Sequence, residues 1–124
     1  MPDDKPVIWM GASRKDLRAM SDGVQDAIGF ALDRAQKGRS HPSIKPLSGK
    51  DFGGVYEIRA NVDKDTYRAV YVLNLGDRIF MLHVFKKKSK RGVATPKPDL
   101  DLIRSRLRDA RELAKELDDE QGQN

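Results

Sequence analysis

Hydrophobic residues recur along this chain at two spacings, one typical of helices and one typical of strands. Between Leu17 and Ala35 they fall three or four positions apart, which predicts helix, and Gly38 ends the pattern. Ser13 and Ser21 each begin a sequence typical of a helix start. We therefore expect two short N-terminal helices in a hairpin.

Strand patterns occupy the middle of the chain. Segments rich in β-branched and aromatic residues predict strands at residues 55–60, 67–75 and 78–85, and a short apolar run predicts a first strand at residues 7–10. Residues 38–54 have no clear periodicity, so we expect a surface connection there. Gly76-Asp77, between the last two strands, is typical of a two-residue type II′ hairpin turn.

A second helical pattern follows at the C-terminal end. Thr95-Pro96 precedes an apolar stripe that begins at Leu100, and this predicts a helix ending near Leu117. Residues 118–124 are acidic and predict a disordered tail, which leaves residues 1–117 as one domain. The expected fold class is α+β, a small antiparallel sheet with two N-terminal helices packed on one face and a C-terminal helix.

The predicted turns fix which residues pair across the sheet. With Gly76-Asp77 as the loop, the pairs are Leu73 with Phe80, Tyr71 with Leu82, and Arg68 with Phe85. With residues 61–66 as the preceding loop, Arg59 faces Arg68 and Ala60 faces Tyr67. The core face then holds Tyr56, Ile58, Ala69, Tyr71, Leu73, Phe80, Leu82 and Val84.

The opposite face carries the candidate chemistry. One row across it contains Arg59, Arg68 and Phe85, and the next contains Glu57, Val70 and His83. Because like charges on adjacent strands repel, the two arginines predict an anion between them, and an RNA phosphate would fit. Phe85 offers a ring on which a base could stack. The apolar part of this face, Val70, Val72, Ile79 and Met81, is expected to be covered by the N-terminal segment or by a partner helix.

Charge and composition favour a polyanionic partner. The 124 residues include 24 Lys and Arg against 19 Asp and Glu, a formal net charge of +5. A basic run extends past the last strand and contains Lys86, Lys87, Lys88, Lys90 and Arg91. With no cysteine and two histidines, thiol catalysis and a histidine-rich metal site are excluded, and we expect no cofactor. No signal peptide or long apolar run is recognisable, so the expected location is cytoplasmic.

Each of these features also has a purely structural interpretation. The basic run is consistent with a solvated surface, and Arg59 could pair with Glu57 or Asp63 at little energetic consequence. A strand histidine such as His83 is more often structural than a general base. Arginines on the outer face of the final helix are ordinary choices for solubility, so no site is predicted there.

Five segments, taken in order and spacing, resemble one protein family. They are Lys45-Pro46-Leu47, Val55-Tyr56-Glu57-Ile58-Arg59, Tyr67-Arg68-Ala69-Val70-Tyr71, His83-Val84-Phe85-Lys86-Lys87-Lys88-Ser89 and Thr95-Pro96. The chain resembles the HigB-like, phage-derived branch of the RelE/ParE toxin superfamily over most of its length. The resemblance implies a RelE-like fold and the toxin of a type II toxin–antitoxin system. Such a toxin cuts mRNA on the translating ribosome without a metal and is restrained by a helix-turn-helix antitoxin.

The resemblance also implies roles for individual residues. It implies that Arg59, Arg68 and Lys87 stabilise the charge that develops on the phosphate. It further implies base stacking at Phe85 and an RNA contact at Lys88, and the basic run adds Lys86, Lys90 and Arg91 as candidate RNA-binding residues. Some family members carry a proton-transfer aromatic residue or histidine near the C-terminus. This chain has neither there, so His83 or Glu57 is the candidate for proton transfer.

Two other functions remain open at this stage. A group within the same superfamily inhibits DNA gyrase without cutting RNA, and the paired arginines with Phe85 argue against that function. A basic RNA-binding regulatory module is the third possibility. Such a module would bind free RNA tightly and with a steep dependence on salt.

Overall fold

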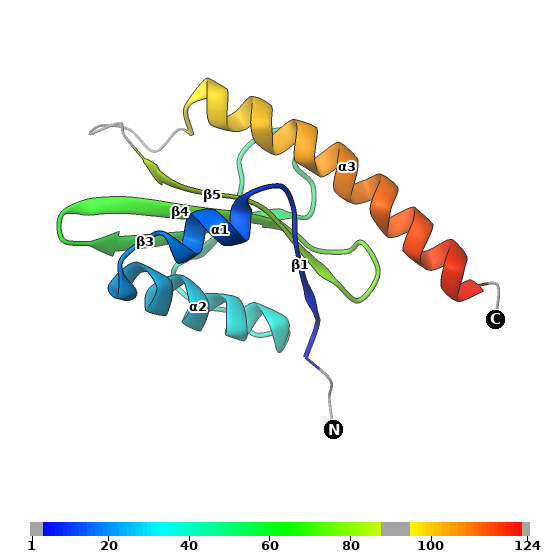
Figure 1. Ribbon diagram of the computed structural model, residues 1–124, viewed down its shortest axis with the longest axis horizontal. Helices are drawn as coiled ribbons and strands as arrows, with labels where there is room; N and C mark the ends of the chain where they lie inside the picture. The colour runs from blue at the N-terminus through cyan, green and yellow to red at the C-terminus, as the bar shows by residue number, and fades with distance from the viewer. Residues whose placement is uncertain (1–3, 88–94, 123–124) are drawn as a thin grey trace.

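A five-stranded sheet with helices on both faces forms this protein (Figure 1). The computed structural model describes residues 4–87 and 95–122. The elements are β1 (Val7–Trp9), α1 (Ser13–Arg18), α2 (Asp22–Gln36), β2 (Ile44–Pro46), β3 (Val55–Val62), β4 (Asp65–Val72), β5 (Ile79–Lys87) and α3 (Lys97–Gly122). The strand order is β1-β5-β4-β3-β2. The predicted α+β class is confirmed, although the sheet is mixed, because β1 runs parallel to β5.

The two N-terminal helices begin in different ways. Ser21 caps α2 as predicted, since its hydroxyl accepts a hydrogen bond from the Val24 amide at 3.4 Å. Ser13 is not a cap but the first residue of α1. Its buried hydroxyl donates to the Met81 carbonyl at 3.3 Å, and this bond ties α1 to β5.

The hydrophobic core consists of two layers, one on each face of the sheet. Under α1 and α2, Leu17, Ile28 and Leu32 pack against sheet residues such as Ile58 and Tyr71. On the other face α3 contributes Ile103, Leu107, Ala110 and Ala114, which pack against Val70, Val72, Phe80 and Leu82. Figure 1 shows α3 on the far side of the sheet from α2. Val70 and Val72, which were expected to lie under the N-terminal segment or a partner helix, are therefore covered by α3.

The β3–β4 hairpin has the predicted register. Arg59 pairs with Arg68, and Ala60 pairs with Tyr67. The strands continue beyond these pairs, so the connection is the two-residue turn Asp63-Lys64 rather than residues 61–66. Both turn residues have positive φ, 51° and 71°, as a type I′ turn requires.

The predicted register of β4 and β5 is correct at one end and wrong at the other. Arg68 pairs with Phe85, but Tyr71 pairs with Met81 rather than Leu82, and Val72 rather than Leu73 pairs with Phe80. A bulge inserts one extra residue, Leu82, into β5. The connection is also longer than predicted, because β4 ends at Val72 and β5 begins at Ile79.

This bulge changes which side chains face which helices. Phe80 and Leu82 face α3 instead of the N-terminal helices, and Ile79 and Met81 lie under α1 and α2. Arg106 of α3 donates to the Leu82 carbonyl at 2.8 Å, so the irregular strand keeps a hydrogen-bond partner there.

Helix α3 is longer than predicted. It continues through residues 118–122, so the predicted helix end and disordered tail are wrong for those residues. Asp118 forms an ion pair with Arg78 at 2.9 Å, which ties the end of α3 to the connection between β4 and β5. Among the described residues, no helix is long and apolar enough to cross a membrane.

The strained turn residue Lys64 gives a test of the hairpin. We expect Lys64→Gly to raise the free energy of unfolding by about 0.5–1 kcal/mol, because glycine adopts positive φ without a Cβ clash. Lys64→Ala removes the same charge but keeps the strain, so it should give no gain. Urea denaturation of both variants measures the difference, and equal stability of the two would contradict the type I′ assignment.

Candidate functional site

Three cationic side chains from three adjacent strands surround one carboxylate. Glu57 of β3 is 2% exposed and lies on the same sheet face as Arg59, Arg68 and Lys87. Arg59 Nε donates to Glu57 Oε1 at 2.6 Å, and Arg68 Nη1 lies 3.3 Å from Glu57 Oε2. The anion that the facing arginines require is therefore supplied by the protein itself.

The beginning of α3 closes this group of side chains from above the sheet. Arg68 Nη1 donates to the hydroxyl of Thr95 at 3.4 Å. Asp99, in the first turn of α3, lies 2.8 Å from His83 Nε2. The His83 ring stacks on Phe85 with centroids 4.6 Å apart and planes 14° apart. We call Glu57, Arg59, Arg68, His83, Lys87, Thr95 and Asp99 the sheet-end cluster.

Burial and like charge act on the cations of this cluster. Burial lowers the pKa of Lys87, and the neighbouring Arg68 and Arg59 lower it further while Glu57 opposes them. Burial also lowers the pKa of Arg68, and Glu57 opposes that effect. In the sheet-end cluster, Arg59, Arg68 and Lys87 stand against Glu57 and Asp99, a formal excess of +1 with His83 neutral. An additional anion at this place would be stabilised.

The structure brings together six of the predicted site residues. Arg59, Arg68, Lys87, Glu57, His83 and Phe85 lie on one face, as the register predicted. Their exposure differs from the prediction, because α3 covers this face and Lys87 and Phe85 are each 8% exposed. Phe85 has one ring face on His83 and little free surface for a base, and its stacking role stays a prediction.

The predicted basic run is only partly described. Lys86 is exposed and pairs with Asp65 at 3.1 Å. Lys88, Lys90 and Arg91 lie outside the described residues. Their predicted RNA contacts, like that of Lys86, stay predictions.

Two cluster members were not predicted from the sequence as site residues. Thr95 and Asp99 reach the strands only because the first turn of α3 lies over them. An acidic residue such as Asp99 is favourable at a helix N-terminus without any partner on the sheet. A contact between residues 16 positions apart has no signal in a local pattern.

His83 is the best-placed candidate for moving a proton. It is 7% exposed, and its Nδ1 atom is buried with no hydrogen-bond partner among the described residues. Asp99 at Nε2 favours the tautomer with a proton there, which leaves Nδ1 as an acceptor. Within residues 4–87 and 95–122, no group of three acidic, histidine or cysteine residues could hold a metal ion.

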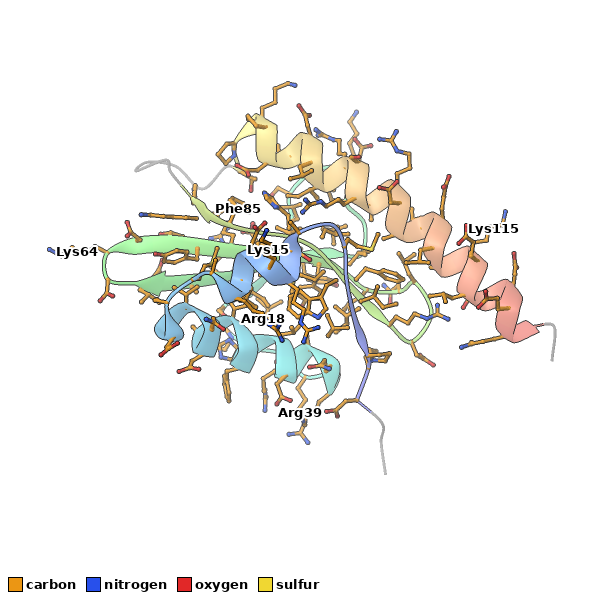
Figure 2. All side chains as sticks on the ribbon, in the orientation of Figure 1. Lys15, Arg18, Arg39, Lys64, Phe85 and Lys115 are labelled. Atoms are coloured by element: carbon orange, nitrogen blue, oxygen red, sulfur yellow. The ribbon has the colours of Figure 1, made fainter. Side chains whose placement is uncertain are left out.

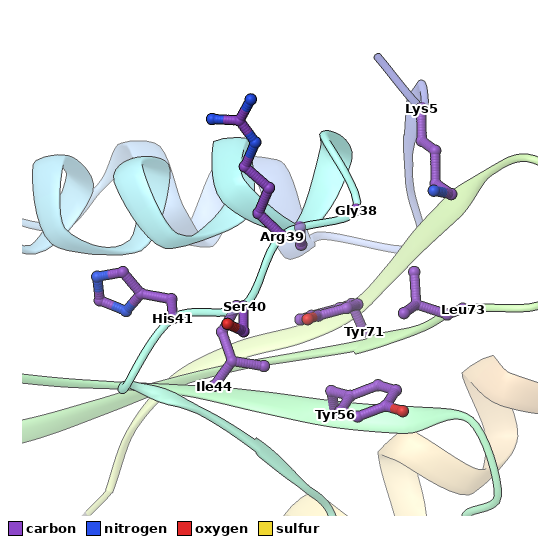
Figure 3. A pocket seen from close by; sticks show the side chains of 10 residues that line it. Lys5, Gly38, Arg39, Ser40, His41, Ile44, Tyr56, Tyr71 and Leu73 are labelled. Carbon is purple, nitrogen blue, oxygen red and sulfur yellow. The ribbon is translucent and has the colours of Figure 1, made fainter. Parts of the chain in front are cut away.

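A separate cavity lies on the other face of the sheet (Figure 3). Its volume is about 320 Å³, and its walls come from the end of α2, the following residues 38–41 and the strands. Tyr56 and Tyr71, whose stacked rings are 5.8 Å apart, line it together with Lys5 and Arg39. No predicted site residue within the described parts of the chain lines this cavity.

Glu57 gives a test of the sheet-end cluster. We expect Glu57→Gln to lower the free energy of unfolding by about 3 kcal/mol, because it leaves buried cations without their shared carboxylate. Asp65→Asn removes a carboxylate from the exposed pair with Lys86 and should cost under about 1 kcal/mol. Urea denaturation at pH 7 compares them, and equal costs would show that Glu57 does not hold the cluster together.

Tyr71 gives a test by pH. Burial, followed by the effect of Tyr56, raises the pKa of Tyr71 from 10.0 to about 12. Because the folded state favours the neutral phenol, this contribution to stability is complete below pH 10 and is lost as the pH rises toward 12. The loss should be about 1.4 kcal/mol per pH unit in that interval.

The matched variant is Tyr71→Phe, which has no phenol to ionise. It should not show this loss, so the stability of the wild type relative to the variant should fall by about 1.4 kcal/mol per pH unit above pH 10, and one fewer tyrosine should titrate near pH 12 in the phenolate absorbance. A difference between the two proteins that stays constant with pH would contradict the raised pKa.

Comparison with known proteins places this chain in a family. No curated protein sequence matches the chain. Among solved structures, the chain is similar to one from the toxin–antitoxin complex RelBE2 of Mycobacterium tuberculosis, with 17% identity and a TM-score of 0.49. The match covers 72% of this chain and 98% of that one. The sequence model of the phage-derived Gp49-like protein family matches residues 15–108. This match covers about three quarters of the 124 residues and all of the strands from β2 to β5. This chain therefore belongs to the phage-derived Gp49-like protein family.

Proposed function

We propose that this chain is the toxin of a type II toxin–antitoxin system and cuts mRNA on the translating ribosome. Membership of the phage-derived Gp49-like family agrees with the resemblance found in its residues. The observation that carries the proposal is the gathering of Arg59, Arg68 and Lys87 around Glu57 in the sheet-end cluster. A helix-turn-helix antitoxin is the proposed partner that restrains this activity.

The proposed reaction is an attack by an RNA 2′-hydroxyl on the adjacent phosphate. The new bond joins the 2′ oxygen to phosphorus, and the bond from phosphorus to the 5′ oxygen breaks. Negative charge grows on the phosphate oxygens, and Arg59, 33% exposed at its side chain, is the cluster arginine that a phosphate reaches first. Arg68 lies deeper and is suited to hold Arg59's counter-ion, Glu57, in position.

Two proton transfers complete the reaction. His83, with Asp99 on one nitrogen and an unused acceptor on the other, is suited to take the proton of the 2′-hydroxyl. Glu57 is the alternative base. An ammonium with a lowered pKa gives up its proton more readily, so Lys87 is suited to protonate the departing 5′ oxygen. Because these groups are buried, the reaction requires the substrate or the ribosome to open the cluster.

A second function is favoured by the position of Glu57. Its carboxylate already neutralises Arg59 and Arg68, so the cluster can stabilise the fold without any substrate. A binding protein that inhibits DNA gyrase without catalysis would need the cluster only to stabilise its fold. Cleavage of RNA separates the two functions.

The test is mRNA cleavage by purified protein with and without programmed ribosomes. We expect cleavage only with ribosomes, and about a 100-fold lower rate for Arg59→Gln, because one charge contact to the reacting phosphate is lost. Lys64→Gln removes one exposed cation from the β3–β4 turn and should keep the wild-type rate. Full activity of folded Arg59→Gln would show that the active site lies elsewhere. No cleavage by the wild type in either condition would favour gyrase inhibition.

A further inference from the structure

An open groove on the outer side of α3 carries a second group of cations. It has a volume of about 560 Å³ and lies between α3 and the connection that precedes β3. Four cationic residues line it: Lys50, Arg104, Arg108 and Arg111. Gly53 forms part of its wall beside the buried Leu107. We call this the α3 groove.

The α3 groove joins residues that are distant in the sequence. Arg104, Arg108 and Arg111 are four and three positions apart, so they follow one face of the helix. Lys50 and Gly53 come from more than 50 positions earlier and form the opposite wall. The helix arginines alone are ordinary surface residues, but a lysine facing them across a hollow makes a positively charged channel.

The charges in the α3 groove are incompletely neutralised. Arg104 lies 3.9 Å from Asp51 and 3.4 Å from Asp101, and its guanidinium is 5.2 Å from the centre of the Phe52 ring. Neither Arg108 nor Arg111 forms an ion pair with any residue in the described parts of the chain. Asp51 is the one carboxylate in the lining and Asp101 also pairs with Arg104, so four cations against two carboxylates leave an excess of +2.

We infer that the α3 groove binds the phosphate backbone of RNA. Arginine forks suit phosphate oxygens, and an exposed groove with excess charge of one sign attracts a polyanion regardless of its sequence. At 1.5 Å per residue, Arg104 and Arg111 lie about 10 Å apart along the helix, a span that accommodates more than one phosphate. The sheet-end cluster begins at Asp99, about 18 Å along α3 from Arg111.

This binding is independent of the proposed cleavage reaction. The α3 groove shares no side chain with the sheet-end cluster, so RNA can be held there whether or not the cluster is catalytic. If the cluster does cut mRNA, the α3 groove would orient the protein on the RNA of its target. An acidic protein segment is the competing occupant, and the experiment separates it from RNA.

The experiment measures binding of a fluorescein-labelled 20-base-pair RNA duplex by anisotropy at several salt concentrations. Arg108→Gln/Arg111→Gln should weaken binding at least tenfold and make the slope of log affinity against log salt shallower by about 1–2. Lys15→Gln/Arg18→Gln, on α1 (Figure 2), makes the same change in net charge on a helix that packs into the other core layer. It should change the affinity less than twofold.

A second pair of variants tests the α3 groove without removing a side chain. A Cβ at Gly53 meets no atom within 4 Å, and its backbone lies outside the left-handed region, so substitution there does not disturb the fold. Gly53→Glu should weaken binding at least fivefold, whereas Gly53→Gln should stay within twofold of the wild type. Lys64→Gln, in the exposed β3–β4 turn, should bind the duplex like the wild type. Binding is measured without ribosomes and without cleavage, so failure of the proposed cleavage is read separately from failure of this inference.

Three results would overturn the inference. One is equal loss of binding in the α1 and α3 double variants, because net charge alone would then explain the affinity. Another is equal binding by Gly53→Glu and Gly53→Gln. The third is tighter binding of a 20-residue poly-glutamate peptide than of the duplex at the same salt, which would assign the α3 groove to an acidic protein partner.

Discussion

The buried carboxylate of Glu57 is the contact on which the rest of the sheet end depends. Two arginines face each other across β3 and β4, an arrangement that is unfavourable without an anion between them. Glu57 accepts hydrogen bonds from both arginines and is almost fully buried. Removing one charge of this group would leave another buried charge without its partner and would lower the stability of the fold. Arg68 also donates to Thr95, just before α3, so the same group of charges contacts the chain that leads into that helix.

Helix α3 converts an exposed sheet face into a second core. Its apolar side chains cover Val70, Val72 and the residues turned toward it by the bulge at Leu82. Arg106 satisfies the Leu82 carbonyl, and the bulge therefore costs no buried hydrogen bond there. The same helix shields the sheet-end cluster from water, and removal from water strengthens the electrostatic interactions of its charges.

The sequence predicts those parts of the fold that depend on local patterns. The Arg59–Arg68 pair was predicted because alternation within β3 and β4 and a short connection determine their register. The pairing of Tyr71 was wrong, because Leu82 adds a residue to β5 and an apolar side chain fits either face of a sheet covered on both sides. The role of Glu57 was underestimated because no local pattern shows that α3 covers it. Without α3 above it, the pair with Arg59 is a weak surface contact rather than a buried one.

The positive charge of this chain is divided between two environments with different physical consequences. Glu57, Arg68 and Lys87 of the sheet-end cluster are buried, so dissolved salt screens their charges weakly and they can act on a phosphate over short distances. Charges in the α3 groove are exposed, and salt at physiological concentration screens them beyond about 8 Å. Exposed charge of this kind increases the rate of encounter with a polyanion, whereas buried charge stabilises one defined geometry. An analysis of net charge alone cannot separate these contributions, because both sets enter the same total of +5.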